Sequence, residues 1–299
     1  MEYAIETEGL TKYYGSVRGI EDVALKVRPG EVFGFLGPNG AGKTTTIRLL
    51  LNLLHPTRGS ARVLGMDVQR QSLEVRRRCG VVSGEPAFYD SLSGTAHVEL
   101  VQSFHGDARA RRIGELAERL DLDLSRPVRS YSHGMRQKLA IVQAMAHDPE
   151  LLILDEPTAG LDPLVQHEFY RMLDEERGRG KAVFLSSHIL SEVERVCDGV
   201  GIVREGRLVA VLDVADLKLH RVRRMEVFLG REAVAGDFQV EGVEVVRCEG
   251  NRADLLVSGH VGELVRCLAA LPVEDVVFPE ATLEDTFMQF YSDESEDAA

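Results

Sequence analysis

The sequence predicts an α/β fold in which helices flank a mostly parallel sheet, with an antiparallel β edge sheet, a helical insertion lobe and a small C-terminal αβ domain. Three observations lead to this prediction. Short apolar runs alternate with helix-period segments as far as about residue 215, the pattern of parallel strands joined by crossover helices. A glycine-rich segment separates a buried strand from the helix after it, and short β-like runs return after residue 218.

The core of the main domain is predicted from continuous apolar runs, which are typical of strands covered on both faces. Such runs lie at residues 32–36, 151–154 and 182–185. Helical periodicity predicts helices at residues 43–53 and 163–179.

Two regions interrupt this alternation. From residue 8 to residue 27, apolar and polar side chains alternate toward the end of the segment, which favours an antiparallel sheet with one face in water. Helices predicted at residues 95–105 and 109–120 form the helical lobe.

We expect three parts along the chain. Residues 1–218 form the main domain, with the helical lobe at about 84–147. After a predicted hairpin at 199–212, short β-like runs and a helix predict a small αβ accessory domain over residues 219–291. Residues 292–299 carry four acids and no apolar side chain larger than alanine, so we expect an acidic, disordered tail.

The composition excludes several classes of protein. A chain of 299 residues that is 44% hydrophobic and 28% charged is not mainly disordered. No apolar run approaches the roughly 18 to 20 residues that cross a bilayer, so a role at a membrane requires another, spanning chain. The net charge of −13 argues against a general affinity for nucleic acid, whose phosphates are held mainly by clustered cations.

Compartment and redox state follow from the N-terminus and the cysteines. The N-terminus lacks a basic stretch followed by an apolar core, so we expect a cytoplasmic protein. The four cysteines stand far apart with no short paired spacing, which favours reduced thiols over a zinc or redox site.

The glycine-rich segment matches a glycine, four residues and then Gly-Lys-Thr. Glycines let the backbone amides surround an anion, and the helix N-terminus adds its positive end. This context predicts a P-loop NTPase fold, in which Lys43 bridges the terminal phosphates and the Thr44 hydroxyl binds the accompanying Mg²⁺. A glycine-rich turn before a structural helix is the alternative. The residues expected to bind nucleotide here are Gly37, Pro38, Asn39, Gly40, Ala41, Gly42, Lys43, Thr44 and Thr45.

Two acids follow the apolar run at 151–154, where open parallel sheets bind their ligands. We expect Asp155 to hold magnesium through a water. Glu156 is placed to accept a proton from an attacking water or to polarise it. A strand can end in acids by chance, but the glycine-rich loop with Lys43 argues against that alternative.

Residues 131–137, about twenty residues before these acids, resemble the signature motif of ATP-binding cassette (ABC) ATPases. His133 stands where a second glycine is common. In physical terms, Ser132, Gly134 and the amides at a helix start form a second anion site. Taken alone, the segment would be a plain capped helix.

Three further elements of that family follow. Residues 157–162 resemble its D-loop, which implies a nucleotide contact by Asp162. His188 occupies the place of the switch histidine, where it could reach a γ-phosphate, although a lone histidine is usually a surface or core residue. Tyr14 corresponds to the aromatic residue on which adenine stacks, with Tyr13 as the alternative.

One element departs from the family. A glutamine normally lies at the junction with the helical lobe, and counting back from Tyr89 puts Gly84 there with Glu85 beside it. We hypothesise that Glu85 substitutes as a metal ligand. The alternative is a hinge without a ligand role. The resemblance otherwise covers roughly residues 3–215.

The resemblance implies an ATP-hydrolysing subunit of an ABC transporter that uses ATP and Mg²⁺, with Lys43, Glu156 and His188 in catalysis. It also implies a second copy that closes around ATP and a separate transmembrane permease, which alone would attach the protein to the inner face of the cell membrane.

The form of the signature, the lysine loop and residues 281–287 resemble the multidrug and antibiotic-export branch. A soluble cassette protein acting on nucleic acid or ribosomes is the alternative, but this chain has no second cassette, long coiled coil or basic surface. A small-molecule kinase would leave Ser132 and His188 unexplained.

Overall fold

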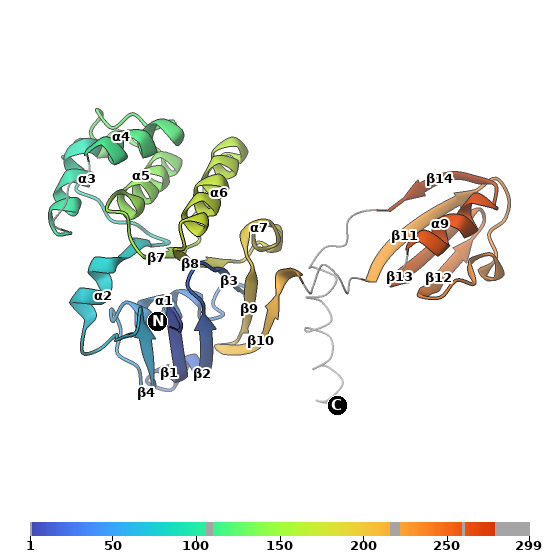
Figure 1. Ribbon diagram of the computed structural model, residues 1–299, viewed down its shortest axis with the longest axis horizontal. Helices are drawn as coiled ribbons and strands as arrows, with labels where there is room; N and C mark the ends of the chain where they lie inside the picture. The colour runs from blue at the N-terminus through green and yellow to red at the C-terminus, as the bar shows by residue number, and fades with distance from the viewer. Residues whose placement is uncertain (1, 106–109, 216–221, 259–260, 279–299) are drawn as a thin grey trace. The chain divides into compact units, whose positions relative to one another are not determined.

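The computed structural model describes residues 2–105, 110–215, 222–258 and 261–278 (Figure 1). The chain divides into two compact units, Met1–Leu212 and Asp213–Ala299, and each is described by itself. The boundary expected near residue 218, the tail at 292–299 and the branch motif at 281–287 lie outside the described residues. Among the helices of the described ranges, none combines the length and apolar character that crossing a membrane requires.

A six-stranded sheet forms the centre of the first unit, and its strands from β9 to β6 are parallel. Every residue of β3, β7 and β8 is buried, which confirms the prediction from continuous apolar runs. Strands β7 and β8 extend beyond the apolar runs to include Asp155 and Ser187. The order across the sheet is β10 (Arg207–Asp213), β9 (Gly199–Arg204), β3 (Val32–Leu36), β8 (Ala182–Ser187), β7 (Leu151–Asp155) and β6 (Cys79–Val82).

Helices connect these strands. The helix predicted at 43–53 ends earlier, because Asn52 adopts a left-handed φ of 51° and the amide of Leu53 returns to the carbonyl of Arg48. The helix predicted at 163–179 is confirmed with its C-terminus one residue earlier. The bounds are α1 (Lys43–Leu50), α2 (Ser72–Arg78), α6 (Pro163–Gly178) and α7 (Leu190–Val196).

An antiparallel sheet with the order β2-β1-β4-β5 lies beside the central sheet, and α1 packs against strands of both (Figure 1). Val23, Leu25 and Val27 are buried in one core with Phe33 and Phe184, so the predicted alternation is confirmed. Strands β4 and β5 were not predicted, because β4 buries only two of its residues. The bounds are β1 (Ile5–Tyr14), β2 (Val17–Val27), β4 (Arg58–Val63) and β5 (Met66–Asp67).

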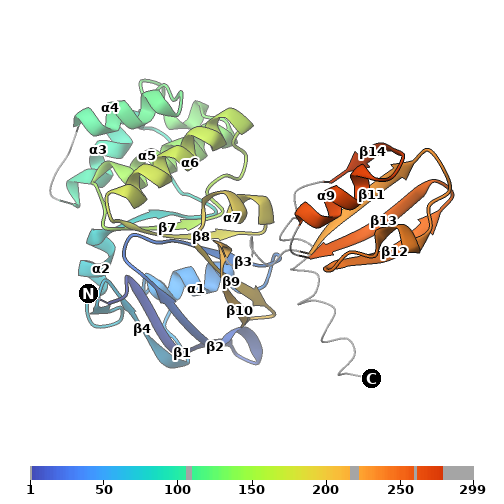
Figure 2. The same cartoon turned by 45° about the vertical axis from the view of Figure 1, so that its right-hand side comes forward.

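A helical lobe follows β6, and its three helices pack against one another (Figure 2). The helices predicted at 95–105 and 109–120 are present, although the start of the second lies next to residues outside the described ranges. The Ser93 side chain caps α3 by accepting from the Ala96 amide. The bounds are α3 (Gly94–Ser103), α4 (Ala110–Arg119), the 3₁₀ turn η1 (Val128–Ser130) and α5 (His133–Ala146).

The second unit is an antiparallel sheet with the order β12-β13-β11-β14 and its own buried core, to which Leu264 and Leu268 of α9 contribute. The predicted β-like runs and helix are confirmed. Strand β14 was not predicted, since four of its five residues are exposed. The bounds are β11 (Val222–Leu229), η2 (Ala235–Phe238), β12 (Val243–Glu249), β13 (Arg252–Ser258), α9 (Val261–Ala269) and β14 (Val273–Val277).

The turn between β9 and β10 joins the antiparallel sheet to the glycine-rich loop. Gly206 accepts from the Glu21 amide at 2.7 Å and donates to the Ala41 carbonyl at 3.0 Å. Its φ is 80° and an added Cβ would lie 2.8 Å from the Gly19 carbonyl oxygen, so glycine is required here.

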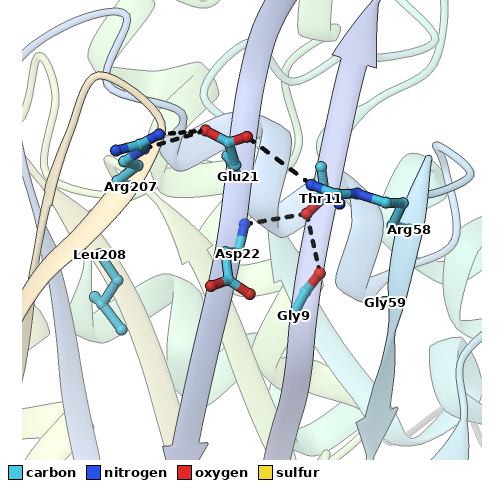
Figure 3. A pocket seen from close by; sticks show the side chains of 8 residues that line it. All are labelled: Gly9, Thr11, Glu21, Asp22, Arg58, Gly59, Arg207 and Leu208. Carbon is cyan, nitrogen blue, oxygen red and sulfur yellow. Dashed lines mark hydrogen bonds and ion pairs between the residues drawn. The ribbon is translucent and has the colours of Figure 1, made fainter.

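The Glu21 side chain ties this turn to the sheet at the side of a hollow of about 640 Å³. Figure 3 shows its carboxylate between Arg207 and Arg58. Arg207 donates at 2.8 Å and the Tyr13 hydroxyl at 2.9 Å, while Arg58 lies at 3.9 Å. Hydrogen bonds from Arg207 and then Tyr13 lower the pKa of Glu21 to about 2.

This pKa predicts a pH-dependent contribution to stability. Because the folded pKa is about 2 and the ordinary value is 4.5, the stabilisation is complete above about pH 4.5 and is lost as the pH falls toward 2. Glu21→Gln should therefore lower the Tm at neutral pH, and its difference from the wild type should shrink between about pH 5 and pH 3. Thermal unfolding across this range measures it, with the exposed Glu8→Gln on β1 as control. A Tm difference independent of pH would contradict the prediction.

Candidate nucleotide-binding site

A pocket of about 290 Å³ opens where three segments meet: the β1–β2 hairpin, the loop before α1 and the residue after β7. The first three residues of α1 face it, so the positive end of that helix is directed at the pocket. Its lining consists of Tyr14, Val17, Arg18, Gly19, Asn39, Gly40, Gly42, Lys43, Thr44, Thr45 and Glu156.

The loop at residues 37–42 is shaped by glycines. Gly40 and Gly42 have φ values of 82° and 107°, a region that glycine enters without steric cost. Gly37 lies directly on β9, since a Cβ there would be 2.3 Å from the Val203 carbonyl oxygen. The backbone can therefore pass close to its neighbours and still curve around the pocket.

Lys43 is held inside this loop. Only 5% of the residue is exposed. Its Nζ donates to the carbonyl oxygens of Gly37 at 2.7 Å and Pro38 at 3.1 Å. The same Nζ lies 3.3 Å from Glu156 Oε1, so the loop and the acid after β7 meet at one ammonium group.

Asp155 and Thr44 place two side-chain oxygen atoms of the kind that ligate metal ions next to each other. The Thr44 hydroxyl donates to Asp155 Oδ2 at 2.8 Å, and the Ser186 hydroxyl donates to Oδ1 at 2.6 Å. Mg²⁺ prefers oxygen ligands and usually keeps several waters beside one or two protein ligands, so this pair fits the ion. Ser186 was missed by the sequence analysis, although two serines at the end of an apolar run were a usable signal.

Glu156 has an unusual backbone and a doubly paired carboxylate. Its φ of 48° is left-handed, which costs a non-glycine residue about 1–3 kcal/mol. The Ser186 hydroxyl accepts from its amide at 3.2 Å, and Gln137 Nε2 donates to the neighbouring Pro157 carbonyl at 2.8 Å. The Oε2 atom of Glu156 lies 3.2 Å from His188 Nδ1. The fold thus brings together Lys43, Glu156 and His188, and adds Gln137, for which no role was predicted.

The two tyrosines expected as alternatives are clearly separated. Tyr14 lines the pocket, is 45% exposed and has its hydroxyl 3.5 Å from Thr45 Oγ1. The Tyr13 hydroxyl instead donates to Glu21. Adjacent residues of a strand point to opposite faces, so only Tyr14 presents its ring to the pocket.

Comparison with known proteins identifies the family. The ABC transporter family profile matches residues 20–159. The bacitracin transport ATP-binding protein BcrA of Bacillus licheniformis is 35% identical over 299 residues, covering 97% of each chain. The chain belongs to the ATP-binding proteins of ABC transporters. The daunorubicin resistance ATP-binding protein DrrA3 of Streptomyces coeruleorubidus is 36% identical, covering 97% of this chain and 96% of that protein.

Solved structures agree with this assignment. The ATP-binding subunit of an ABC transporter superposes with a TM-score of 0.68 at 34% identity, covering 72% of this chain and 92% of that one. The ATP-binding cassette MJ0796, a dimer bound to ADP and phosphate, has a TM-score of 0.65 at 21% identity. The match covers 70% of this chain and 98% of that one, and it supports the fold. The predicted P-loop α/β fold, the family resemblance and ATP binding are confirmed, and Mg²⁺ is the usual partner ion of ATP in this family. Proteins of this family hydrolyse ATP to power transport.

At the junction with the helical lobe, this ABC protein places Gly84 against Asp155. A Cβ at Gly84 would lie 3.4 Å from Asp155 Oδ2. Glu85 is exposed, and none of the described hydrogen bonds or ion pairs connects its carboxylate to Asp155 or Thr44. A ligand role for Glu85 stays a prediction.

Ser132, Gly134 and Asp162 are absent from the described lining of the pocket. Ser132 caps α5 by accepting from the Met135 amide at 3.3 Å. Asp162 caps α6 by accepting from two amides at 3.1 Å. A Cβ at Gly134 would lie 2.7 Å from the Gly160 carbonyl oxygen, so the signature segment and the D-loop touch within one chain.

The tyrosine geometry predicts which ring supports the adenine. Aromatic stacking on a base is worth about 1–3 kcal/mol, so Tyr14→Ala should raise the Kd for ATP about 5- to 150-fold. Tyr13→Ala, which removes a ring from the other face, should leave the Kd within about twofold. Titration with a fluorescent ATP analogue measures both. Equal losses in the two variants would contradict the assignment.

Proposed function

We propose that this protein is the ATP-hydrolysing subunit of an exporter and powers a separate membrane-spanning permease. The observation that carries the proposal is the contact of Glu156 with both Lys43 and His188 beside the P-loop. Homologous ABC ATP-binding proteins work with separate permeases and dimerise. Relatives in bacitracin transport and daunorubicin resistance, aligned over 97% of this chain, favour export of an antibiotic-like compound.

The catalytic roles follow from the contacts. Lys43 holds the terminal phosphates, and Glu156 takes a proton from the attacking water. His188 Nδ1, 3.2 Å from Glu156 Oε2, orients that carboxylate. Thr44 and Asp155 would hold Mg²⁺, and the bound ion would neutralise charge on the phosphate oxygens.

The residues outside the pocket suit a second copy of the chain. Ser132 is exposed, and its oxygen accepts from the Met135 amide, so its proton is available for a phosphate oxygen of the partner's ATP. Gly134 lies in the first turn of α5, which Ser132 caps, and Asp162 caps the start of α6. In this proposal ATP joins the two copies, and hydrolysis lets them part.

We further propose that the protein lies at the inner face of the cell membrane, attached only through its permease. A net charge of −13 disfavours a nucleic-acid partner, because phosphate backbones bind clustered cations.

The proposed catalytic role of Glu156 can be tested by substitution. Glu156→Gln keeps the size of the side chain but removes the base, so ATP turnover should fall at least about 100-fold. Binding of ATP should persist, and the variant should accumulate as an ATP-bound dimer. Phosphate release and analytical ultracentrifugation measure these outcomes, with the exposed Glu263→Gln on α9 as control. Normal turnover would remove Glu156 from the catalytic role.

The proposed permease partner can be tested by purification from membranes. The tagged chain, purified from detergent-solubilised membranes of its own cells, should retain a hydrophobic chain with about six apolar spans, each of the roughly 20 residues that cross a bilayer. Mass spectrometry of the eluate identifies it. Recovery with ribosomes or nucleic acid instead, resistant to raised salt, would favour the soluble cassette alternative.

A further inference from the structure

Glu192 on α7 is a buried carboxylate with no role in the mechanism above. The residue is 7% exposed. It accepts hydrogen bonds from three hydroxyls: Thr158, Ser187 at 2.6 Å and Tyr170 at 3.3 Å. Among the described ion pairs, none joins Glu192 to an arginine or lysine. Burying a carboxylate is costly unless hydrogen bonds compensate, and these three hydroxyls offset that cost.

Two of the donors belong to the two catalytic segments. Ser187 is the last residue of β8 and directly precedes His188, and it bonds to Oε2. Thr158 lies two residues after Glu156 and bonds to Oε1. One carboxylate therefore connects the segment that carries His188 to the segment that carries Glu156.

Both connections lead into short, hydrogen-bonded turns. The Ser187 hydroxyl accepts from the Ile189 amide at 2.9 Å, so the bond spans His188. On the other side, the Ala159 amide donates to the Glu156 carbonyl at 3.2 Å. A displacement of Glu192 is thus transmitted to both partners of the 3.2 Å contact between Glu156 and His188.

We propose that Glu192 is a positioning residue for ATP hydrolysis, which sets the separation between the Glu156 carboxylate and the His188 ring. The inference rests on the catalytic roles proposed for those two residues. A carboxylate accepts from all three hydroxyls. An amide of the same size has one acceptor oxygen, so a hydroxyl that faces its NH₂ group has to turn its proton elsewhere. For Ser187 the other acceptor is the Ile189 carbonyl at 3.3 Å, and the link from residue 192 to the segment of His188 then changes.

The test uses Glu192→Gln in the full chain. Misplacement of a catalytic group by about 1 Å costs about 100-fold in rate, so kcat should fall about 10- to 100-fold. KM for ATP should stay within about twofold, because Glu192 is absent from the described lining of the pocket. Tyr170→Phe is the matched control. It removes the third hydrogen bond, which comes from α6 and from neither catalytic segment, so its kcat should match the wild type.

A double-mutant cycle separates positioning from a general structural effect. If Glu192 acts through the contact between Glu156 and His188, adding Glu192→Gln to His188→Ala should cause no further loss in single-turnover rate. Losses that multiply, or a wild-type kcat in Glu192→Gln, would overturn the inference. If Glu192→Gln does not fold, Ser187→Ala and Thr158→Val take its place in the cycle under the same criteria.

Failure of the inference is distinguishable from failure of the proposed function. Wild-type turnover in Glu156→Gln and His188→Ala would overturn the catalytic assignment itself. Loss of turnover in those two variants, with normal kcat in Glu192→Gln, would overturn only the positioning role.

Discussion

Glu156 has to leave a buried parallel strand and still present its carboxylate to two other segments of the chain. It does so with a left-handed φ of 48°, and its neighbourhood is held by Ser186 and Gln137. From that position it meets Lys43 and His188. These groups follow β7, β3 and β8, which are neighbours in the sheet. The site is thus a consequence of parallel strands ending at a common edge.

The glycine-rich loop is confined by its surroundings as much as by its own sequence. Gly37 packs against Val203 of β9. In the turn of the β9–β10 hairpin, the Gly206 amide donates to the Ala41 carbonyl. Glu21 then links the hairpin to the antiparallel sheet. Loop, hairpin and edge sheet are therefore packed and hydrogen-bonded to one another beside the pocket.

Much of the first unit could be predicted because its signals are local. A continuous apolar run such as 32–36 indicates a strand without reference to the rest of the chain, and all five of its residues are buried. Of the strands that escaped prediction, β4, β5 and β14 lack such a run, and β6 is only four residues long and contains a glycine. The end of α1 was misplaced because the left-handed turn at Asn52 interrupts a pattern that still appears helical.

The sequence by itself determined the family, the phosphate loop and the two acids at the end of β7, since each motif consists of residues only a few positions apart. Only the tertiary structure decided that Tyr14 faces the pocket, that Gly84 lies against Asp155, and that Gln137, Ser186 and Glu192 support the reacting groups. These contacts join residues that are distant in the sequence, such as Gly84 and Asp155, or Thr158 and Glu192, which are 34 positions apart. Local periodicity carries no information about which distant segments meet, because that is settled by strand order and packing.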